Sequence, residues 1–152
     1  MPNWCSNEVT IEGDAEQLLD LAKVSGLLTK TGKLKRKPEF NFSAVCPCDH
    51  EPTLKAEAEF QKTNTQENRI SAELFDWNRA HWGTKWSPGD DVFDVRMKNG
   101  VLQMTFDTAW SPPTGVFEHI VSRWPKLRVF VRYEEPGNDL SGEDSYYGDE
   151  VI

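Results

Sequence analysis

Cys46, Cys48 and His50 come closest in this sequence to a reactive or metal-binding cluster. They alternate along the chain, so an extended backbone would place them on one face, where Cys5 could add a fourth ligand for tetrahedral zinc. Structural zinc sites more often use cysteine pairs that are two to four residues apart, whereas a single proline separates this pair. We therefore expect packed or exposed thiols at these positions, and neither a metal nor another cofactor.

The other groups that could support catalysis form no recognisable signature. His81 and His119 lie outside any nucleophile–base motif, and the acidic pairs Asp90–Asp91 and Glu134–Glu135 fall at expected turns or strand ends. The segment 83–85 has the residues Gly-Thr-Lys but is far shorter than a phosphate-binding loop. The sequence therefore predicts a binding protein and not an enzyme.

Length and composition favour one globular domain over 1–152. The 152 residues match the usual size of a domain, and the 11% aromatic content, with six Trp, is typical of a packed core. Three cysteines are an odd number for a disulfide framework, and the N-terminus lacks the basic and apolar segments of a secretory signal. No apolar run is long enough to cross a membrane. We expect a cytoplasmic protein with reduced thiols.

The charge is unevenly distributed. Five cations lie between 30 and 37, namely Lys30, Lys33, Lys35, Arg36 and Lys37, whereas the segment from Glu134 to the end has seven acids and no Lys or Arg. The net charge of −8 disfavours general nucleic-acid binding, which depends on neutralising phosphates. Solvated surface is the simpler interpretation of both segments. The alternative for the acidic end is a decoy surface for a partner that normally grips nucleic acid.

Hydrophobic periodicity predicts the elements of the first two thirds. Alternation predicts strands at 8–12 and at 39–45, the latter with Phe40 and Phe42 on one face. Between them, Asp14 is a helix cap and Gly26 a plausible helix end. Two further helices are expected at 53–62 and 71–82. The strand at 39–45 and the two further helices form an insertion over about 28–88, between the first helix and the hairpin.

The last third predicts a hairpin, a helix and a strand. Residues 91–98 and 101–109 alternate on either side of Asn99-Gly100, a strong hairpin signal. Ser111-Pro112-Pro113 begins a helix, and 127–133 alternates as the final strand. Residues 134–152 are expected to be a polar, turn-rich segment. The order predicts an α+β, ferredoxin-like split βαβ core, an antiparallel sheet with helices on one face.

Candidate binding residues fall into three groups. Tryptophans at element ends pack a small core in the simpler interpretation, and in the alternative they are interface anchors. A lysine between two of them could hold an anionic or peptide ligand. If Leu127, Val129 and Val131 face the helices, alternate residues of that strand lie on an open face with Arg96, Thr105 and Asp107, as in sheets that stack single-stranded RNA. Acids of the last segment complete the set. The candidates are Trp82, Lys85, Trp86, Trp110, Arg128, Phe130, Arg132, Tyr133, Glu134, Glu135, Asp139, Glu143 and Asp144.

Four segments of the chain resemble a known family. They are Met1-Pro2-Asn3-Trp4-Cys5-Ser6-Asn7, Trp82-Gly83-Thr84-Lys85-Trp86, Phe106-Asp107-Thr108-Ala109-Trp110-Ser111-Pro112-Pro113 and Tyr133-Glu134-Glu135-Pro136-Gly137. Together they resemble the YubB-like proteins of plasmids and phages. The resemblance implies a ferredoxin-like domain and a mobile-element origin, but no reaction, because the family is functionally uncharacterised. Residues 28–70 match least well, and the resemblance leads us to expect no cysteines where Cys46 and Cys48 stand.

The sequence thus supports three hypotheses. The first is a non-catalytic accessory protein of a phage or plasmid that binds and inhibits a host protein, with a defence or nucleic-acid-processing complex as the favoured target (anti-CRISPR or anti-restriction type). Its acidic surface would mimic phosphate, and no membrane would be involved. The second is a single-stranded nucleic-acid-binding module that uses the open sheet face. The third, a zinc-dependent enzyme, is the least favoured.

Overall fold

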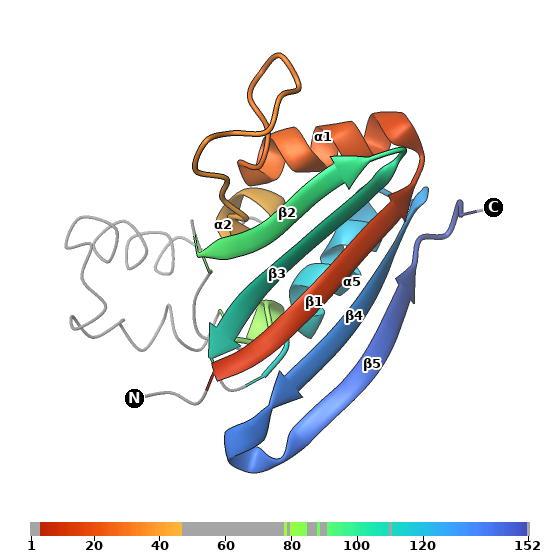
Figure 1. Cartoon of the computed structure of the whole chain (residues 1–152). Coiled ribbons are helices and arrows are strands. Elements are labelled where there is room, and N and C mark those ends of the chain that lie inside the picture. Colours follow the sequence, from red (N-terminus) through yellow and green to blue (C-terminus); the bar gives the residue numbers. More distant parts are fainter. Residues whose placement is uncertain are drawn as a thin grey trace, which may run out of the picture.

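The computed structural model describes residues 4–46, 78, 80–84, 88, 91–109 and 111–151. These residues form a five-stranded antiparallel sheet in the order β2-β3-β1-β4-β5, with the helices on one of its faces (Figure 1). The strands are β1 (Trp4–Gly13), β2 (Val92–Lys98), β3 (Val101–Ala109), β4 (Leu127–Glu135) and β5 (Leu140–Tyr147). The helices are α1 (Ala15–Ser25), the short α2 (Phe42–Val45), α5 (Thr114–Arg123) and a 3₁₀ turn at Pro136–Asn138.

The sheet has a buried face and an open face because its side chains alternate. In β1, Cys5, Asn7, Val9 and Ile11 are buried, while the residues between them are at least partly exposed. The predicted hairpin strands and the predicted strand at 127–133 match β2, β3 and β4 closely. The hairpin turns at Asn99 and Gly100, whose positive φ values are those such a turn requires.

Helix α1 begins and ends at the predicted residues. The Asp14 carboxylate accepts a hydrogen bond of 3.1 Å from the backbone N–H of Gln17, which satisfies one free donor of the first turn. Gly26 ends the helix in the left-handed conformation with φ of 99°. Leu18, Leu21 and other apolar residues of its inner face are fully buried against the sheet.

An aromatic cluster joins the chain after α1 to the sheet. The Phe40 ring stacks on Phe106 of β3 with centroids 5.7 Å apart, and the Phe42 ring lies 5.9 Å from Phe106 and 5.5 Å from Trp82. All four side chains are buried. Such contacts add to the stabilisation from apolar burial.

The predicted strand at 39–45 is wrong, because the chain turns into α2 there. The Asn41 side chain caps this helix by accepting hydrogen bonds from the backbone N–H groups of Ser43 and Ala44 at 2.9 and 3.4 Å. Phe40 and Phe42 are both buried, as the alternation required. Phe40 precedes the helix cap and Phe42 is the first residue of α2, and both side chains point into the core. Two buried residues on either side of a polar one therefore do not identify a strand.

The predicted polar turn segment after 134 is also wrong, because β4 continues to Glu135 and Leu140–Tyr147 forms the edge strand β5. Each β5 residue pairs with β4, from Glu135 opposite Leu140 to Arg128 opposite Tyr147. β5 shows no apolar alternation because most of its residues are exposed. Charged residues on an edge strand also discourage pairing with other chains.

Two parts of the sequence prediction lie outside the described residues. They are the expected helix at 53–62 and most of the expected helix at 71–82, and with them most of the insertion over 28–88. In the described part, no helix is long and apolar enough to cross a membrane.

Adjacent tyrosines of β5 test the placement of this strand. Tyr146 packs on Phe117 of α5 with ring centroids 5.5 Å apart, whereas Tyr147 is 57% exposed on the open face. We expect Tyr146→Ala to lower the free energy of unfolding by about 2 kcal/mol, and Tyr147→Ala by less than about 1 kcal/mol. Urea unfolding of both variants measures the difference. Equal losses would contradict the assigned faces of β5.

Gly115 tests the contact between the start of α5 and residues 81–84. A Cβ on Gly115 would lie 1.8 Å from the carbonyl oxygen of His81, so the backbone would have to move. Gly115→Ala should therefore lower the free energy of unfolding by more than about 2 kcal/mol. Gly100→Ala is the control, because no atom lies within 4 Å and only its φ of 76° opposes a side chain, at a cost of about 1 kcal/mol. A smaller loss for Gly115→Ala than for the control would refute the contact.

Candidate functional site

The open face of the sheet is the one that no helix of the described residues covers (Figure 1). The strand register sets which side chains lie side by side on it. Thr105, Glu8, Arg132 and Glu143 form one row across β3, β1, β4 and β5. Gln103, Thr10, Phe130 and Ser145 form the next row, and Val101, Glu12, Arg128 and Tyr147 the third. We call this surface the open face.

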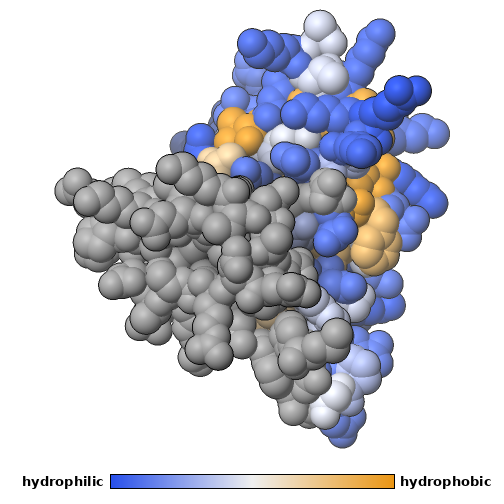
Figure 2. Space-filling view, turned by 90° about the vertical axis from the view of Figure 1, so that its left-hand side faces the viewer, coloured by the Kyte–Doolittle hydropathy of each residue, from blue (hydrophilic) through white to orange (hydrophobic). Residues whose placement is uncertain are grey.

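Aromatic side chains are exposed at both edges of the open face. Phe93 of β2 is 48% exposed, opposite Thr105, and Tyr147 of β5 is 57% exposed. The Tyr147 ring lies edge-on to the half-buried Phe130, with centroids 6.1 Å apart and an interplanar angle of 88°. Figure 2, with the open face along its right-hand side, shows apolar residues interrupting a hydrophilic surface there. Large exposed aromatic groups are the anchors that protein interfaces favour.

Both arginines of β4 are paired with glutamates of neighbouring strands. Arg128 donates from Nε to Oε1 of Glu12 in β1 at 2.7 Å. Arg132 donates from Nε and Nη2 to Oε1 of Glu143 in β5 at 3.1 and 3.0 Å. These pairs neutralise the two cations and fix their directions across the sheet. The Arg132 and Glu143 side chains are about 70% exposed, so their pair contributes little to stability, whereas Arg128 and Glu12 are only 35% and 29% exposed.

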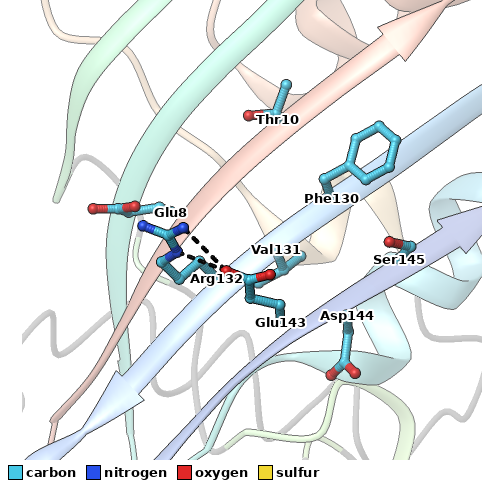
Figure 3. Close-up of a pocket in the computed structure, with 8 residues that line it drawn as sticks. All are labelled: Glu8, Thr10, Phe130, Val131, Arg132, Glu143, Asp144 and Ser145. Atoms are coloured by element: carbon cyan, nitrogen blue, oxygen red, sulfur yellow. Dashed lines mark hydrogen bonds and ion pairs between the residues drawn. The ribbon is translucent and has the colours of Figure 1, made fainter.

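A shallow hollow of about 290 Å³ lies on the open face over β1, β4 and β5 (Figure 3). Figure 3 shows Arg132 reaching toward Glu143 in this hollow, with the Glu8 carboxylate beside the guanidinium and Phe130 and Thr10 farther along the strands. The lining mixes an aromatic ring, hydroxyl groups and an ion pair. Such a surface suits polar and apolar contacts with another macromolecule more than enclosure of a small molecule.

The structure brings together part of the predicted binding set. Arg128, Phe130, Arg132 and Glu143 lie on the open face, and Glu134 shares their side of β4 by register with Ser6. Asp139 is exposed in the turn before β5. Asp144 is exposed, but its register with Val131 places it on the opposite side of the sheet. Lys85, Trp86 and Trp110 lie outside the described residues.

Trp82, Glu135 and Tyr133 are not surface anchors. Trp82 is only 3% exposed, and its indole N–H donates to the carbonyl of Cys46 at 3.3 Å. Glu135 is fully buried, so it adds nothing to an acidic surface. Tyr133 packs against the core, with its hydroxyl over Gly142 of β5, where a Cβ would lie 2.6 Å away. A tryptophan at the end of an element can either pack into a small core or anchor an interface, and Trp82 packs into the core.

A buried polar cluster that the sequence did not reveal ties the N-terminal strand to distant segments. The Asn7 amide donates to the carbonyls of Cys5 and Phe106 and to the Thr108 hydroxyl, at 2.9 to 3.2 Å. Thr108 in turn donates to the carbonyl of Ser111 at 2.6 Å. These bonds satisfy the amide nitrogen of Asn7, which would be costly to bury unpaired, whereas its buried amide oxygen accepts no hydrogen bond from the described residues.

A second pair of bonds fixes residues 83 and 84 to the end of β3. The Thr84 hydroxyl donates to the carbonyl of Ala109 at 2.9 Å, and the Ser111 hydroxyl donates to the carbonyl of Gly83 at 2.6 Å. Three of the four segments that carry the family resemblance therefore meet at this end of the sheet. Glu135, from the fourth segment, raises the pKa of Cys5 electrostatically.

The thiol in this cluster is a poor nucleophile. The pKa of Cys5 is raised from 9.0 to about 11, mainly by burial and also by the charges of Glu135 and Asp107, although a hydrogen bond with Thr108 acts to lower it. Burial and then Arg123 lower the pKa of His119. Cys46 is buried, whereas Cys48 and His50 lie outside the described residues. Among the described residues, no group of three or more His, Cys, Asp or Glu side chains could hold a metal ion.

Thiol reactivity tests the burial of Cys5. In a Cys48→Ser variant, Cys5 and Cys46 should resist a water-soluble disulfide reagent at pH 8 until the protein unfolds, because both thiols are buried. Cys5 is protected further, since a thiol with a pKa of about 11 is ionised at this pH in roughly one molecule in a thousand. Rapid labelling of Cys5 in the folded protein would overturn this assignment.

The same pKa shift has a consequence for stability. The unfolded thiol loses its proton near pH 9 and the folded thiol near pH 11, so the stabilisation is complete below pH 9 and is lost as the pH rises toward 11. The difference in unfolding free energy between the wild type and Cys5→Ala should therefore shrink over this interval.

Comparison with known proteins supports the fold. Residues 81–152 match the family model described as the ferredoxin-like domain in Api92-like protein. The crystal structure of protein api92 from Yersinia pseudotuberculosis is similar over 100% of this chain and 96% of that chain, with a TM-score of 0.59 and 13% sequence identity. No curated protein sequence gives a significant match. At this identity the structural likeness shows the fold alone, and it confirms the predicted α+β, ferredoxin-like class.

Proposed function

We propose that this chain is a non-catalytic accessory protein that binds a partner protein through its open face. The observation that supports this proposal is the combination of exposed aromatic rings, at Phe93 and Tyr147, with arginines already paired to glutamates. Aromatic anchors that have few torsions bury a large area at low entropic cost. The ion pairs between them present both signs of charge in fixed positions, which favours a partner with a complementary mixed surface.

The charge of the open face distinguishes a protein partner from nucleic acid. By register, the face holds four cations and five acids: Arg96, Lys98, Arg128 and Arg132 against Glu8, Glu12, Asp107, Glu134 and Glu143. Nucleic-acid binding surfaces need an excess of positive charge to neutralise phosphates. The alternative function, a single-stranded nucleic-acid-binding module, draws its support from the adjacent rings of Phe130 and Tyr147, on which bases could stack. The local excess of acid argues against it.

The biological setting belongs to the same proposal. The resemblance to proteins of plasmids and phages leads us to propose that this protein acts in a bacterial cytoplasm and inhibits a host protein, in a defence or nucleic-acid-processing complex. The exposed acid Glu134 on the open face, with Asp139 in the turn, would imitate phosphate toward such a target. Glu143 is paired with Arg132, and Asp144 lies on the other side of the sheet. Buried Glu135 has no part in this surface.

The proposal that the protein is non-catalytic draws on the state of its reactive groups. The Cys5 thiol is buried and its pKa is raised, so little thiolate forms near neutral pH. The hollow on the open face holds an ion pair and no nucleophile held by a neighbouring base. The described residues therefore supply contacts and not a reaction centre.

Single alanine variants test the open face. Phe93→Ala and Tyr147→Ala should each weaken binding of the partner at least about tenfold, because each removes an exposed aromatic anchor. Leu140→Ala is the control, since this leucine is 38% exposed but lies on the other side of the sheet by register with Glu135. The partner is first captured from bacterial lysate and identified by mass spectrometry. Dissociation constants are then measured with the purified proteins.

Nuclease treatment of the lysate separates the two functions. Capture through a protein interface should survive the treatment, whereas capture that disappears with it would favour the nucleic-acid-binding alternative. Partner binding that is equally strong in Phe93→Ala, Tyr147→Ala and wild type would refute the role of the open face.

A further inference from the structure

The loop between α1 and α2 concentrates positive charge on an acidic protein. It contains the five cations Lys30, Lys33, Lys35, Arg36 and Lys37, all of them exposed, and the sequence has no acid between Asp20 and Glu39. Because the net charge of the chain is −8, the remainder of the protein has a charge of −8 − 5 = −13. We call residues 28–38 the basic loop.

The basic loop has a defined hairpin shape. Leu28 and Leu34 form an antiparallel bridge, and the N–H of Thr29 donates to the carbonyl of Lys33 at 2.7 Å. The N–H of Gly32 donates to the carbonyl of Thr29 at 2.9 Å, where a φ of 87° lets the chain turn. The N–H of Lys35 donates to the carbonyl of Leu27 at 2.9 Å. The cations are therefore presented on a fixed backbone.

The basic loop projects away from the rest of the protein. In Figure 1 it is the orange loop that rises beyond α1, and the top of the molecule in Figure 2 is mostly hydrophilic. Within the described part of the chain, the ion pairs involve Arg128 and Arg132 and none of the five loop cations. Unpaired like charges repel one another and so do not stabilise the fold. Binding of a negatively charged ligand would explain why five cations are grouped in this loop.

We propose that the basic loop binds the phosphate backbone of nucleic acid, independently of base sequence. Four of the five cations are lysines, which act as mobile point charges toward phosphates. The loop contains no aromatic ring on which a base could stack. The strongly acidic remainder repels nucleic acid from the other faces of the molecule, so the contact is confined to the basic loop.

Nucleic acid fits the composition of the basic loop better than an acidic protein surface does. The central part of a protein interface is depleted in lysine and enriched in aromatic residues, and this loop shows the reverse. Leu34, 48% exposed among the cations, is the one large apolar side chain that the loop presents, and it can contact a groove or a sugar edge. The inference does not depend on the open face, which lies on a different part of the molecule.

Charge variants with matched controls test the basic loop. Fluorescence anisotropy is measured with labelled duplex DNA, duplex RNA and single-stranded DNA of about 20 nucleotides, at low and at physiological salt. The loop variant is Lys35→Gln with Lys37→Gln, and the control is Lys23→Gln with Lys126→Gln, which removes the same charge from exposed positions outside the basic loop and the open face. Circular dichroism and thermal unfolding check that both fold.

The loop variant should weaken nucleic-acid binding about tenfold at low salt and reduce the slope of log K against log salt by about 1.8, since each phosphate contact contributes about 0.9. The control should change binding less than about twofold. Amide chemical shifts should move in residues 29–37 when duplex is added.

Three results would overturn the proposal. Equal weakening by the loop variant and the control would mean that net charge alone sets the binding. Failure of all three nucleic acids to bind at low salt would exclude the ligand. Tighter binding of polyglutamate than of nucleic acid would assign the loop to an acidic protein partner. None of these outcomes bears on the binding of a partner to the open face.

Discussion

The central position of β1 is the constraint on which the rest of the structure depends. This strand pairs with β3 along one edge and with β4 along the other, so both of its neighbours take their register from it. Its alternation places Val9 and Ile11 in the core and Glu8 and Glu12 on the open face. A shift of one residue would exchange the two sets and bury carboxylates. The core and the candidate binding face are therefore fixed by the same register.

Polar bonds replace apolar packing at the end of the sheet where β1 begins. Asn7 is fully buried there, and its amide reaches the backbone of β1 and β3 as well as the Thr108 side chain. Unpaired polar groups in such a place would cost more than a lost contact, so the bonded arrangement permits few alternatives. This explains physically why the segments around Trp82 and Thr108 stand out in the sequence. In their described residues these segments hold this end of the sheet together.

The sequence predicted the parts of the fold in which burial is one-sided and regular. Val9 and Ile11, the turn at Asn99, and Leu127 with its alternate neighbours identified four strands correctly. It missed β5 because Tyr146 is the main residue there that packs on the core. It also missed the pairing of Arg128 with Glu12, since these residues are 116 positions apart and only the register brings them together. The neighbours of a residue on the open face are set by the strand order and register. The local sequence pattern therefore predicted which residues lie on this face, but not that glutamates of adjacent strands neutralise its arginines.

The two proposed contacts of this protein differ in physical character. The open face offers aromatic rings and internally paired charges, and contacts of this kind gain most of their energy from desolvation. The basic loop offers unpaired cations, whose attraction to phosphate falls steeply as salt rises. The −13 charge elsewhere keeps nucleic acid away from the open face. A complex that presents protein and bound nucleic acid side by side could therefore contact the open face and the basic loop at the same time. Because the two contacts respond differently to salt, the salt dependence of binding identifies which of these surfaces is bound.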